Sequence, residues 1–287
     1  MKPGIHQRLV IRLNQIRFKS RTSQPFLSGD AFKELSDFSI NTMEDLAKLK
    51  IKGAEGSVIF CQSELVEDLI AVLKGQYSDL SLIAGNSDRD FEREPAGLVN
   101  TFRISFLQNS SISNNLNIFT LPIGIENLRL GINGLPKNLL SSIPWSKRKG
   151  SVLVGPFSPT HEARNLILSN QPFKGELFTN LTSFVPPKKY SEIVKNHKYI
   201  LCPRGNGLDT HRFWEALYRG SIPIVEKSKW SESLKIMDIP MIEVESSDPE
   251  QITRQVLASD ESRDFENYHP KNVKALWIDY WERLFRK

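Results

Sequence analysis

The sequence predicts an α/β protein built from two Rossmann-like halves, each with a parallel sheet, that face each other across a cleft. Two observations lead to this prediction. Short apolar runs alternate with amphipathic stretches along the chain. Between residues 134 and 149, two prolines, three serines and a Lys-Arg-Lys cluster give the composition of a linker. We therefore expect an N-terminal acceptor-side domain over 1–145, a C-terminal domain over 150–270 and a C-terminal helix over 271–287.

The apolar runs locate the expected strands, and the amphipathic stretches locate the expected helices. The first half predicts strands near 57–61, 80–84, 102–106 and 118–122, with a helix over 63–74. The second half predicts strands near 150–155, 175–179, 199–202, 221–225 and 241–244, and helices over 160–168, from 191 and from 249. A last helix, over 270–285, would expose an apolar side that includes Trp277 and Trp281. These tryptophans suit a helix that crosses back to the first half, although ordinary core packing explains them equally well.

The bulk composition is that of a soluble globular protein, with 39% hydrophobic and 25% charged residues among 287. No apolar run reaches the roughly 18 residues that a membrane span needs. The N-terminus lacks the apolar core and cleavage site of a secretory signal. Cys61 and Cys202 are too few for a disulfide scaffold and are most simply packed thiols. We therefore expect a cytoplasmic protein.

The net charge of +5 is compatible with nucleic acid, anionic lipid or a phosphorylated small molecule as a partner. Positive residues collect over 2–21 and over 147–149. The first segment fits a poor amphipathic helix and a strand about equally well, so packing on the domain and peripheral contact with the inner face of a membrane both stay open. No zinc-finger spacing, aromatic RNA-binding signature or sustained basic stripe occurs, which argues against nucleic acid.

The segment YILCPRGNGLDTHRFWEALYRGSIPIV, over 199–225, is the most informative part of the chain. It predicts an apolar strand, a turn with Arg204, Gly205, Asn206 and Gly207, a helix, and a second strand. Such a turn gathers backbone N–H groups and the positive end of the helix dipole, which suits a phosphate. Asp209, Thr210, His211 and Arg212 crowd the helix start, and Glu215 lies one turn further in. In the structural alternative, Asp209 or Thr210 merely caps the helix of a βαβ unit.

This segment resembles the signature of exostosin-like glycosyltransferases, CPRGxGxDxxRxWEAL followed by an IPV-type strand. The resemblance implies a GT-B fold with the block in its C-terminal half, where it binds a nucleotide-sugar donor. Carried over by position, Arg204 would bind the donor phosphates and Glu215 the ribose. The acceptor would be a glycan or a lipid-linked glycan, as in bacterial polysaccharide biosynthesis.

The segment VLVGPFSPTHEARNLIL repeats the strand–turn–helix pattern. Because ligands bind beyond the carboxyl ends of strands in an open sheet, this turn is expected to face the same cleft. Similar bacterial exostosin-like sequences share a TH-x-x-R pattern, matched here by Thr160, His161 and Arg164. The resemblance implies that Arg164 contacts the donor diphosphate and that His161 lies near the sugar. A capped surface helix with an incidental His and Arg is the alternative.

An inverting transferase needs a general base for the acceptor hydroxyl, and in GT-B folds that base usually comes from the N-terminal half. Asp88, just past an expected strand, is the first candidate and Asp30 the second. Similar sequences often have His where this chain has Gly85, which leaves Asp88 in its place; an Asx-type turn over 86–88 is the alternative. Asn109, Glu126 and Asn127 follow strands and are candidates for the acceptor side, or are loop residues that satisfy backbone groups.

Metal chemistry finds little support in the sequence. There is no H-E-x-x-H or paired Cys spacing. The D-x-D pattern of Asp88 and Asp90, which holds Mn²⁺ or Mg²⁺ in the other main glycosyltransferase fold, lies far in sequence from the donor signature. Glu215 and Glu226 also miss the E-x7-E spacing of many retaining enzymes. We therefore expect an inverting, metal-independent glycosyltransferase without a cofactor, for which the nucleoside-diphosphate sugar is a substrate.

Two other classes stay open. The chain is alternatively a catalytically inactive nucleotide- or phosphate-binding Rossmann-like module, a possibility that Gly85 favours. A dehydrogenase is disfavoured because Gly205 and Gly207 are followed by Thr210, so that G-x-G-x-x-G is incomplete.

Overall fold

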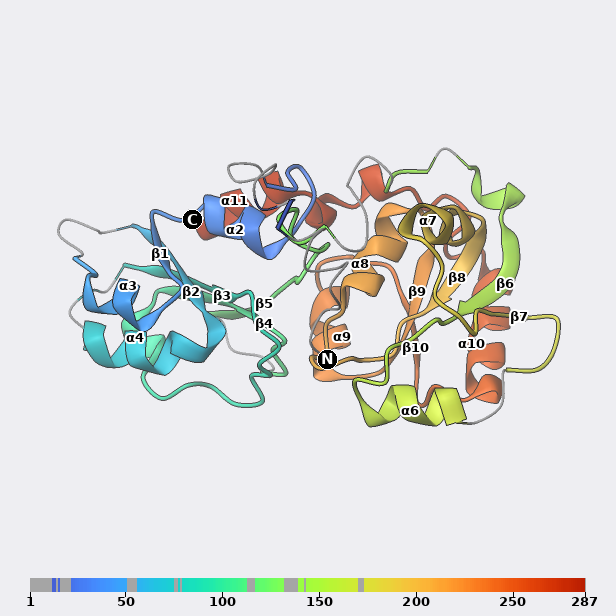
Figure 1. The fold of residues 1–287 in the computed structure, drawn as a ribbon, viewed down its shortest axis with the longest axis horizontal. Coiled ribbons are helices and arrows are strands. Elements are labelled where there is room, and N and C mark those ends of the chain that lie inside the picture. Colours follow the sequence, from blue (N-terminus) through green and yellow to red (C-terminus); the bar gives the residue numbers. More distant parts are fainter. Residues whose placement is uncertain are drawn as a thin grey trace.

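The computed structural model describes residues 12, 13, 15, 22–50, 56–74, 77, 79–112, 117–131, 139–141, 143–169 and 173–286. It contains two lobes side by side, each built on a five-stranded parallel sheet with helices on its faces (Figure 1). The predicted α/β class, with two parallel sheets in two Rossmann-like halves, is confirmed. The basic segment over 2–21 lies almost entirely outside the described residues, so its predicted packing is not addressed.

The strands of the N-terminal sheet lie side by side in the order in which they occur along the chain, β1-β2-β3-β4-β5. Side chains alternate between its two faces, as the pleat of a strand requires. Ile59 and Leu82 pack on one face with helices α3 (Met43–Ala47) and α4 (Val66–Leu73). Phe60 and Phe106 belong to the core on the other face, with helices α2 (Gly29–Glu34) and α11 (Ile278–Phe285). The elements are α2 (Gly29–Glu34), β1 (Phe38–Ile40), α3 (Met43–Ala47), β2 (Val58–Gln62), the 3₁₀ turn η1 (Ser63–Leu65), α4 (Val66–Leu73), β3 (Ser81–Gly85), α5 (Leu98–Thr101), β4 (Ile104–Gln108) and β5 (Ile118–Leu121).

The C-terminal sheet has the order β10-β9-β8-β6-β7, so the chain reverses its direction of travel across the sheet between β6 and β8. Such a topological switch point leaves a crevice outside the carboxyl ends of the two strands. The elements are η3 (Trp145–Lys147), β6 (Lys149–Val154), α6 (Glu162–Ser169), β7 (Phe178–Asn180), α7 (Pro187–Lys195), β8 (His197–Leu201), α8 (His211–Tyr218), β9 (Ile222–Glu226), α9 (Lys229–Lys235), β10 (Ile242–Val244) and α10 (Pro249–Ser262).

The single helix expected over 270–285 is wrong. The structure has two 3₁₀ turns, η4 (Pro270–Asn272) and η5 (Lys274–Leu276), and a short helix α11 (Ile278–Phe285). The break falls at Trp277, whose backbone is extended and forms an antiparallel bridge with Phe26. The next amide, of Ile278, donates to the carbonyl of Pro25 at 3.1 Å. Pairing with the N-terminal lobe therefore replaces the helical hydrogen bonds at this point.

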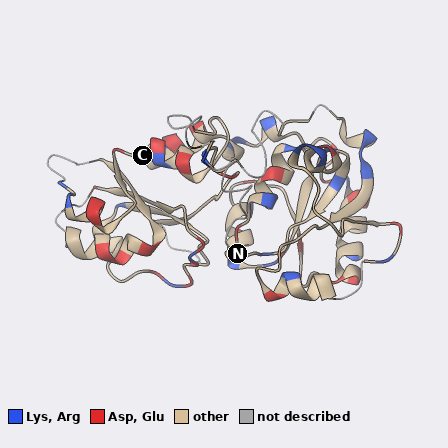
Figure 2. Ribbon diagram, viewed as in Figure 1, with Lys and Arg blue, Asp and Glu red and all other residues tan. Residues whose placement is uncertain are grey.

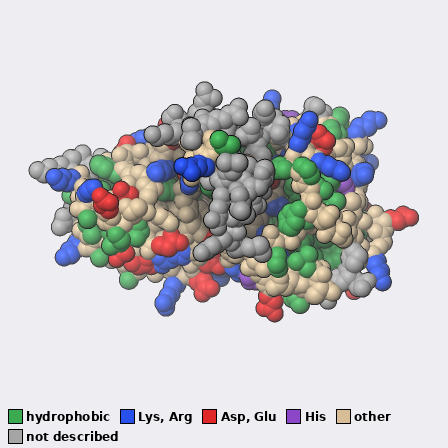
Figure 3. Space-filling model, viewed as in Figure 1, with side chains coloured by type: hydrophobic (Ala, Val, Ile, Leu, Met, Phe, Trp, Pro, Cys, Tyr) green, Lys and Arg blue, Asp and Glu red, His purple; other side chains and the backbone are tan. Residues whose placement is uncertain are grey.

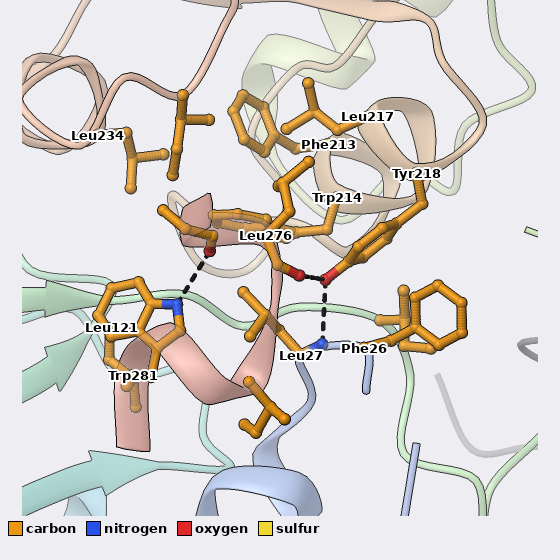
Figure 4. Close-up of a cluster of buried hydrophobic side chains, with 14 of the residues drawn as sticks. Phe26, Leu27, Leu121, Phe213, Trp214, Leu217, Tyr218, Leu234, Leu276 and Trp281 are labelled. Carbon is orange, nitrogen blue, oxygen red and sulfur yellow. Dashed lines mark hydrogen bonds between the residues drawn. The ribbon is translucent and has the colours of Figure 1, made fainter. Parts of the chain in front are cut away.

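A continuous hydrophobic core joins the two lobes. Helix α11 lies against the N-terminal sheet, where Trp281 is fully buried beside Phe32 and Phe106. The Tyr218 hydroxyl, on α8, accepts a hydrogen bond from the Leu27 amide at 3.0 Å and donates to the Leu276 carbonyl at 2.6 Å (Figure 4). Because these groups are buried, the hydroxyl satisfies two backbone atoms that would otherwise lack partners.

Charge is distributed unequally between the lobes. Acidic side chains gather on α3 and α4, whereas Lys and Arg gather on α7 and near β6 (Figure 2). One of the linker cations is not at the surface, because Arg148 is buried and donates to the carbonyls of Ile143 and Arg219. Hydrophobic side chains gather on the front of the C-terminal lobe, over the region between α7 and α6 (Figure 3).

Candidate functional site

A cavity of about 330 Å³ opens at the switch point of the C-terminal sheet. Its volume lies at the lower end of the range of small-molecule sites, roughly 300–1,000 Å³. The segment that follows β6 contributes Pro156, Ser158, Thr160 and Arg164, and the start of α7 with its preceding loop contributes Phe184, Val185, Pro187 and Tyr190. The segment that follows β8 contributes Gly205, Asn206, Gly207, Asp209, Thr210, His211, Arg212 and Glu215, and the N-terminal lobe contributes Asp88 and Ile123.

The start of helix α8 forms one wall of the cavity. Thr210 is its N-cap residue by backbone conformation, but the Thr210 side chain makes no capping hydrogen bond. The Asp209 side chain is not the usual cap of the helix either, because its two carboxylate oxygens accept from the Ile123 amide and the Trp214 indole. The positive end of α8 therefore faces the cavity without a side-chain cap of the usual kind.

Two guanidinium groups lie at the cavity without an ion pair among the described residues. Arg164 donates to the Thr160 hydroxyl at 3.1 Å and to the Pro203 carbonyl at 3.3 Å, while its buried Nε has no partner in the part of the chain that the structure describes. Burial and the nearby charge of Arg212 lower the pKa of Arg164 to about 10. Two cations held close together in a partly buried site favour binding of an anion between or beside them.

The guanidinium group of Arg212 already makes several hydrogen bonds within the protein. It donates to the carbonyls of Gly155 and Pro156, at the end of β6, and to the Tyr190 hydroxyl at 2.7 Å. Its guanidinium also lies 4.7 Å from the centre of the Phe157 ring. Arg212 therefore fixes the turn after β6 against α8 and α7, and its charge lies beside the cavity.

Arg204 lies at the boundary between the lobes and is not among the cavity-lining residues. Its Nη2 forms an ion pair with Asp90 at 2.8 Å, and its buried Nε meets no partner among the residues described. The adjacent Asn206 donates to Asp88 at 2.9 Å. Both aspartates of the D-x-D pattern thus contact the turn after β8, and the role of Arg204 in phosphate binding stays a prediction.

Three further contacts hold the same turn to the N-terminal lobe. The Asp209 amide donates to Asn109 Oδ1 at 2.9 Å, and the Asp209 carboxylate accepts from the Ile123 amide at 2.8 Å. His211 Nδ1 lies 2.8 Å from the Gly124 carbonyl oxygen. Burial raises the pKa of Asp209 to about 7, and the hydrogen bonds that its carboxylate accepts from Ile123 and Trp214 oppose this rise. The carboxyl ends of β4 and β5 therefore dock on the start of α8.

Close packing explains the glycines of this turn. A Cβ on Gly207 would lie 2.6 Å from the Asn109 amide group, and a Cβ on Gly205 would lie 2.9 Å from Arg164 Nη2. Gly205 thus lets the Arg164 side chain lie against the turn, and Gly207 lets the N-terminal lobe approach it.

The carboxylate of Glu215 lines the cavity, and one of its oxygens takes part in an ion pair. Its Oε2 accepts from Arg219 Nη1 at 3.1 Å, an ion pair within helix α8 that is largely buried. The predicted ribose-binding carboxylate is therefore at the cavity wall and oriented by a neighbouring cation.

Besides Arg204, two predicted site residues do not line the cavity. Asp30 is ion-paired with Arg129 at 2.8 Å and does not line the cavity. His161 faces a second groove, of about 840 Å³, that runs along the other side of α6, and its Nδ1 accepts from the Ala163 amide. Of the two candidates for the base, only Asp88 is at the cavity.

The position of Gly85 faces the packed side of the N-terminal sheet. A Cβ there would lie 3.2 Å from Gln108 Oε1 and 3.4 Å from Leu121 Cδ2. Gln108 in turn accepts from the Asn86 amide and donates to the Ser87 carbonyl, which shapes the loop that carries Asp88.

Sequence reasoning missed the wall formed by Phe184, Val185, Pro187 and Tyr190. The only signal in the sequence is a Phe shortly before two prolines, which is too common to identify a site.

The two cysteines are packed thiols, as predicted. Cys61 and Cys202 are both buried, and burial raises the pKa of each to about 12.

The sequence matches no protein-family model and no curated protein. Among solved structures, the fold is similar to an α1,3-fucosyltransferase, with a TM-score of 0.39 and 10% identity over 87% of this chain and 90% of that one. It is also similar to a chain of the GtfA/B complex, with a TM-score of 0.40 and 12% identity over 84% of this chain and 58% of that one. Likenesses of this strength concern overall architecture and carry no argument about chemistry.

In the described part of the chain, no group of three or more His, Cys, Asp or Glu side chains is arranged to hold a metal ion. No helix in that part combines the length and the apolar character that crossing a bilayer requires.

Proposed function

We propose that this protein is a glycosyltransferase that binds a nucleoside-diphosphate sugar in the C-terminal cavity and transfers the sugar to a hydroxyl group. The observation that carries the proposal is the pair of guanidinium groups, Arg164 and Arg212, beside the uncapped start of α8 at a topological switch point. The exostosin-like signature over 199–225 supports the same assignment. We extend the proposal to an enzyme of that family that acts on a glycan or lipid-linked acceptor.

The diphosphate is the part of the donor that this geometry suits best. Within the described ranges of the chain, the buried Nε of Arg164 has no partner and no ion pair neutralises the charge of its guanidinium group. The first N–H groups of α8 and the Thr210 hydroxyl are the further donors. Such preorganised donors would stabilise the charge that develops on the leaving nucleoside diphosphate as the sugar departs. Arg204 would join them by exchanging Asp90 for a phosphate.

Glu215 is our candidate for the ribose hydroxyls. One of its oxygens is held by Arg219, so the carboxylate is fixed in direction, and carboxylates accept from vicinal hydroxyl groups. No other acidic residue from α8 lines the cavity.

Asp88 is our candidate for the general base in an inverting, metal-independent reaction. As the acceptor hydroxyl oxygen bonds to the anomeric carbon, Asp88 would take the hydroxyl proton and the bond to the diphosphate oxygen would break. The residue projects from the N-terminal lobe and lines the cavity that the donor would occupy. Asn206 donates to one of its oxygens, which would orient the carboxylate.

Ligand binding by Arg164→Gln tests the donor site. Calorimetry with UDP, GDP, ADP and CDP is expected to find one that binds the wild type and raises its Tm. Loss of charge-assisted hydrogen bonds worth about 1.5–3 kcal/mol predicts roughly 10- to 150-fold weaker binding of that nucleotide by the variant. Arg254→Gln, which removes an exposed cation on α10, is the matched control and is expected to bind normally.

Two results would overturn the proposal: none of the four nucleotides binds the wild type, or Arg164→Gln, shown to be folded by its Tm and circular dichroism, binds as tightly as the wild type.

The second candidate function, a catalytically inactive nucleotide-binding module, is favoured by Gly85, which leaves no histidine at that position. It predicts nucleotide binding without donor hydrolysis or transfer to any of a panel of acceptors.

A further inference from the structure

We propose that Phe184 forms a stacking platform for the nucleobase of the donor, an inference that rests on the donor site proposed above. Phe184 lines the cavity and yet is 70% exposed, although an aromatic ring is among the side chains that gain most from burial. The ring stands beside Val185 and Pro187, which line the same cavity. The structure thus presents an apolar wall that a planar ligand group would cover.

The chain that follows the ring is conformationally restricted. Pro186 has an extended backbone with φ −54° and ψ 144°, and Pro187 is the first residue of α7. Two consecutive prolines fix two backbone dihedral angles just behind the ring. Helix α7 is in turn anchored on the lobe by the buried residues Ser191 and Val194. A segment restricted in this way loses less conformational entropy when a ligand covers it.

The cavity offers three kinds of group that match the three parts of a nucleotide. Tyr190, one turn along α7 from Pro187, accepts from Arg212, which supplies the cationic part. The carboxylate of Glu215 lies one turn further along α8. Phe184 and its apolar neighbours supply the third part. A nucleoside diphosphate offers anionic phosphates, a ribose diol and a planar aromatic base in one molecule, and each meets a matching group here.

The base is the favoured occupant over a sugar ring because the wall offers an aromatic plane and two aliphatic side chains, and the one hydroxyl among its side chains, that of Tyr190, already accepts from Arg212. Stacking of a base on an aromatic side chain is worth about 1–3 kcal/mol by alanine substitution. Such stacking tolerates any base, so Phe184 would set affinity for the nucleoside without choosing between uridine and guanosine.

The test compares ligands that contain a base with one that does not. Binding of three ligands is measured calorimetrically for wild type, Phe184→Ala and Phe184→Trp: inorganic pyrophosphate, the tightest-binding of the four nucleoside diphosphates, and the sugar nucleotide that contains the same base. We expect Phe184→Ala to bind the nucleoside diphosphate roughly 5- to 150-fold more weakly and pyrophosphate normally. Phe184→Trp, which keeps an aromatic plane, is expected to retain binding of the nucleotide. Ile236→Ala, at a residue that is 81% exposed and does not line the cavity, is the control for loss of an exposed apolar side chain.

Three outcomes would overturn the platform and leave the donor site standing. Phe184→Ala binds the nucleoside diphosphate as the wild type does; it weakens pyrophosphate to the same extent; or it weakens only the nucleotide sugar, which would make Phe184 a contact of the sugar. If the wild type binds neither nucleotide nor pyrophosphate, the donor site itself is refuted, and the platform falls with it.

Discussion

The buried carboxyl group of Asp209 predicts a pH-dependent stability that can be measured. Asp209 lies between the lobes, where burial raises its pKa from 3.8 to about 7. Between these two pH values the folded protein holds a proton that the unfolded chain has lost. The free energy of unfolding contributed by this group is therefore fully present below pH 3.8, falls as the pH rises, and is lost above pH 7.

The size of this pH effect on stability follows from the pH range between the two pKa values. One pH unit within it is worth about 1.4 kcal/mol, so raising the pH from 5 to 8, which includes about two units below pH 7, should cost on the order of 3 kcal/mol. The variant Asp209→Asn cannot titrate. The stability of the wild type relative to this variant, from urea unfolding, should therefore fall by that amount between pH 5 and pH 8.

Asp248→Asn is a control, because the pKa of Asp248 is shifted in the opposite direction from that of Asp209. Hydrogen bonds from the Ser246 hydroxyl and the Gln251 amide lower the pKa of Asp248, so its contribution is lost only in acid, and the difference from the wild type should stay constant between pH 5 and pH 8. If the difference between the wild type and Asp209→Asn is equally constant, or grows in favour of the wild type at pH 8, our reasoning is refuted. The hydrogen bonds from Ile123 and Trp214 would then outweigh burial and keep Asp209 ionised throughout.

Two further substitutions test the contact between the lobes and the chemistry. Tyr218→Phe leaves the buried Leu27 amide and Leu276 carbonyl without their shared partner, and at about 1–3 kcal/mol for each unsatisfied group it should lower the free energy of unfolding by about 2–6 kcal/mol in urea; a loss below about 1 kcal/mol would contradict this account. Asp88→Asn should reduce kcat for sugar transfer about 10²- to 10⁴-fold, while nucleotide affinity stays within a few-fold of the wild type. Normal turnover would exclude Asp88 as the base.

The local strand–turn–helix units could be predicted from the sequence because each is encoded within about 20 residues. The turn after β8 is marked by its glycines, and the apolar runs on either side fix the strands. Short elements escaped detection: β1 has only three residues and α5 four, too few for a periodic pattern. The last helix was mispredicted because its apolar spacing is helical, and only the pairing of Trp277 with Phe26 reveals the break.

The order of strands and the contacts between the lobes could not be predicted in the same way. The sequences of β6 and β8 do not indicate that the two strands are neighbours in the sheet, although the cavity lies where they are adjacent. The ion pair of Arg204 with Asp90 joins residues 114 positions apart, and the pair of Asn206 with Asp88 joins residues 118 apart. A motif read along the chain assigns such residues to a ligand because it cannot contain the partner that the fold supplies.

The signature over 199–225 therefore divides into two sets with different physical tasks. Thr210, Arg212 and Glu215 face the cavity from α8 and its N-cap, whereas Gly207 and Asp209, which also line the cavity, hold the N-terminal lobe through Asn109 and the amide of Ile123. Substitution in the first set changes the groups that a ligand meets. Substitution in the second set changes where Asp88 lies relative to that ligand, because the loop that carries it docks on the same turn. A loss of transfer with intact nucleotide binding is thus expected from either the base or the lobe contacts, and only the accompanying change in stability separates the two.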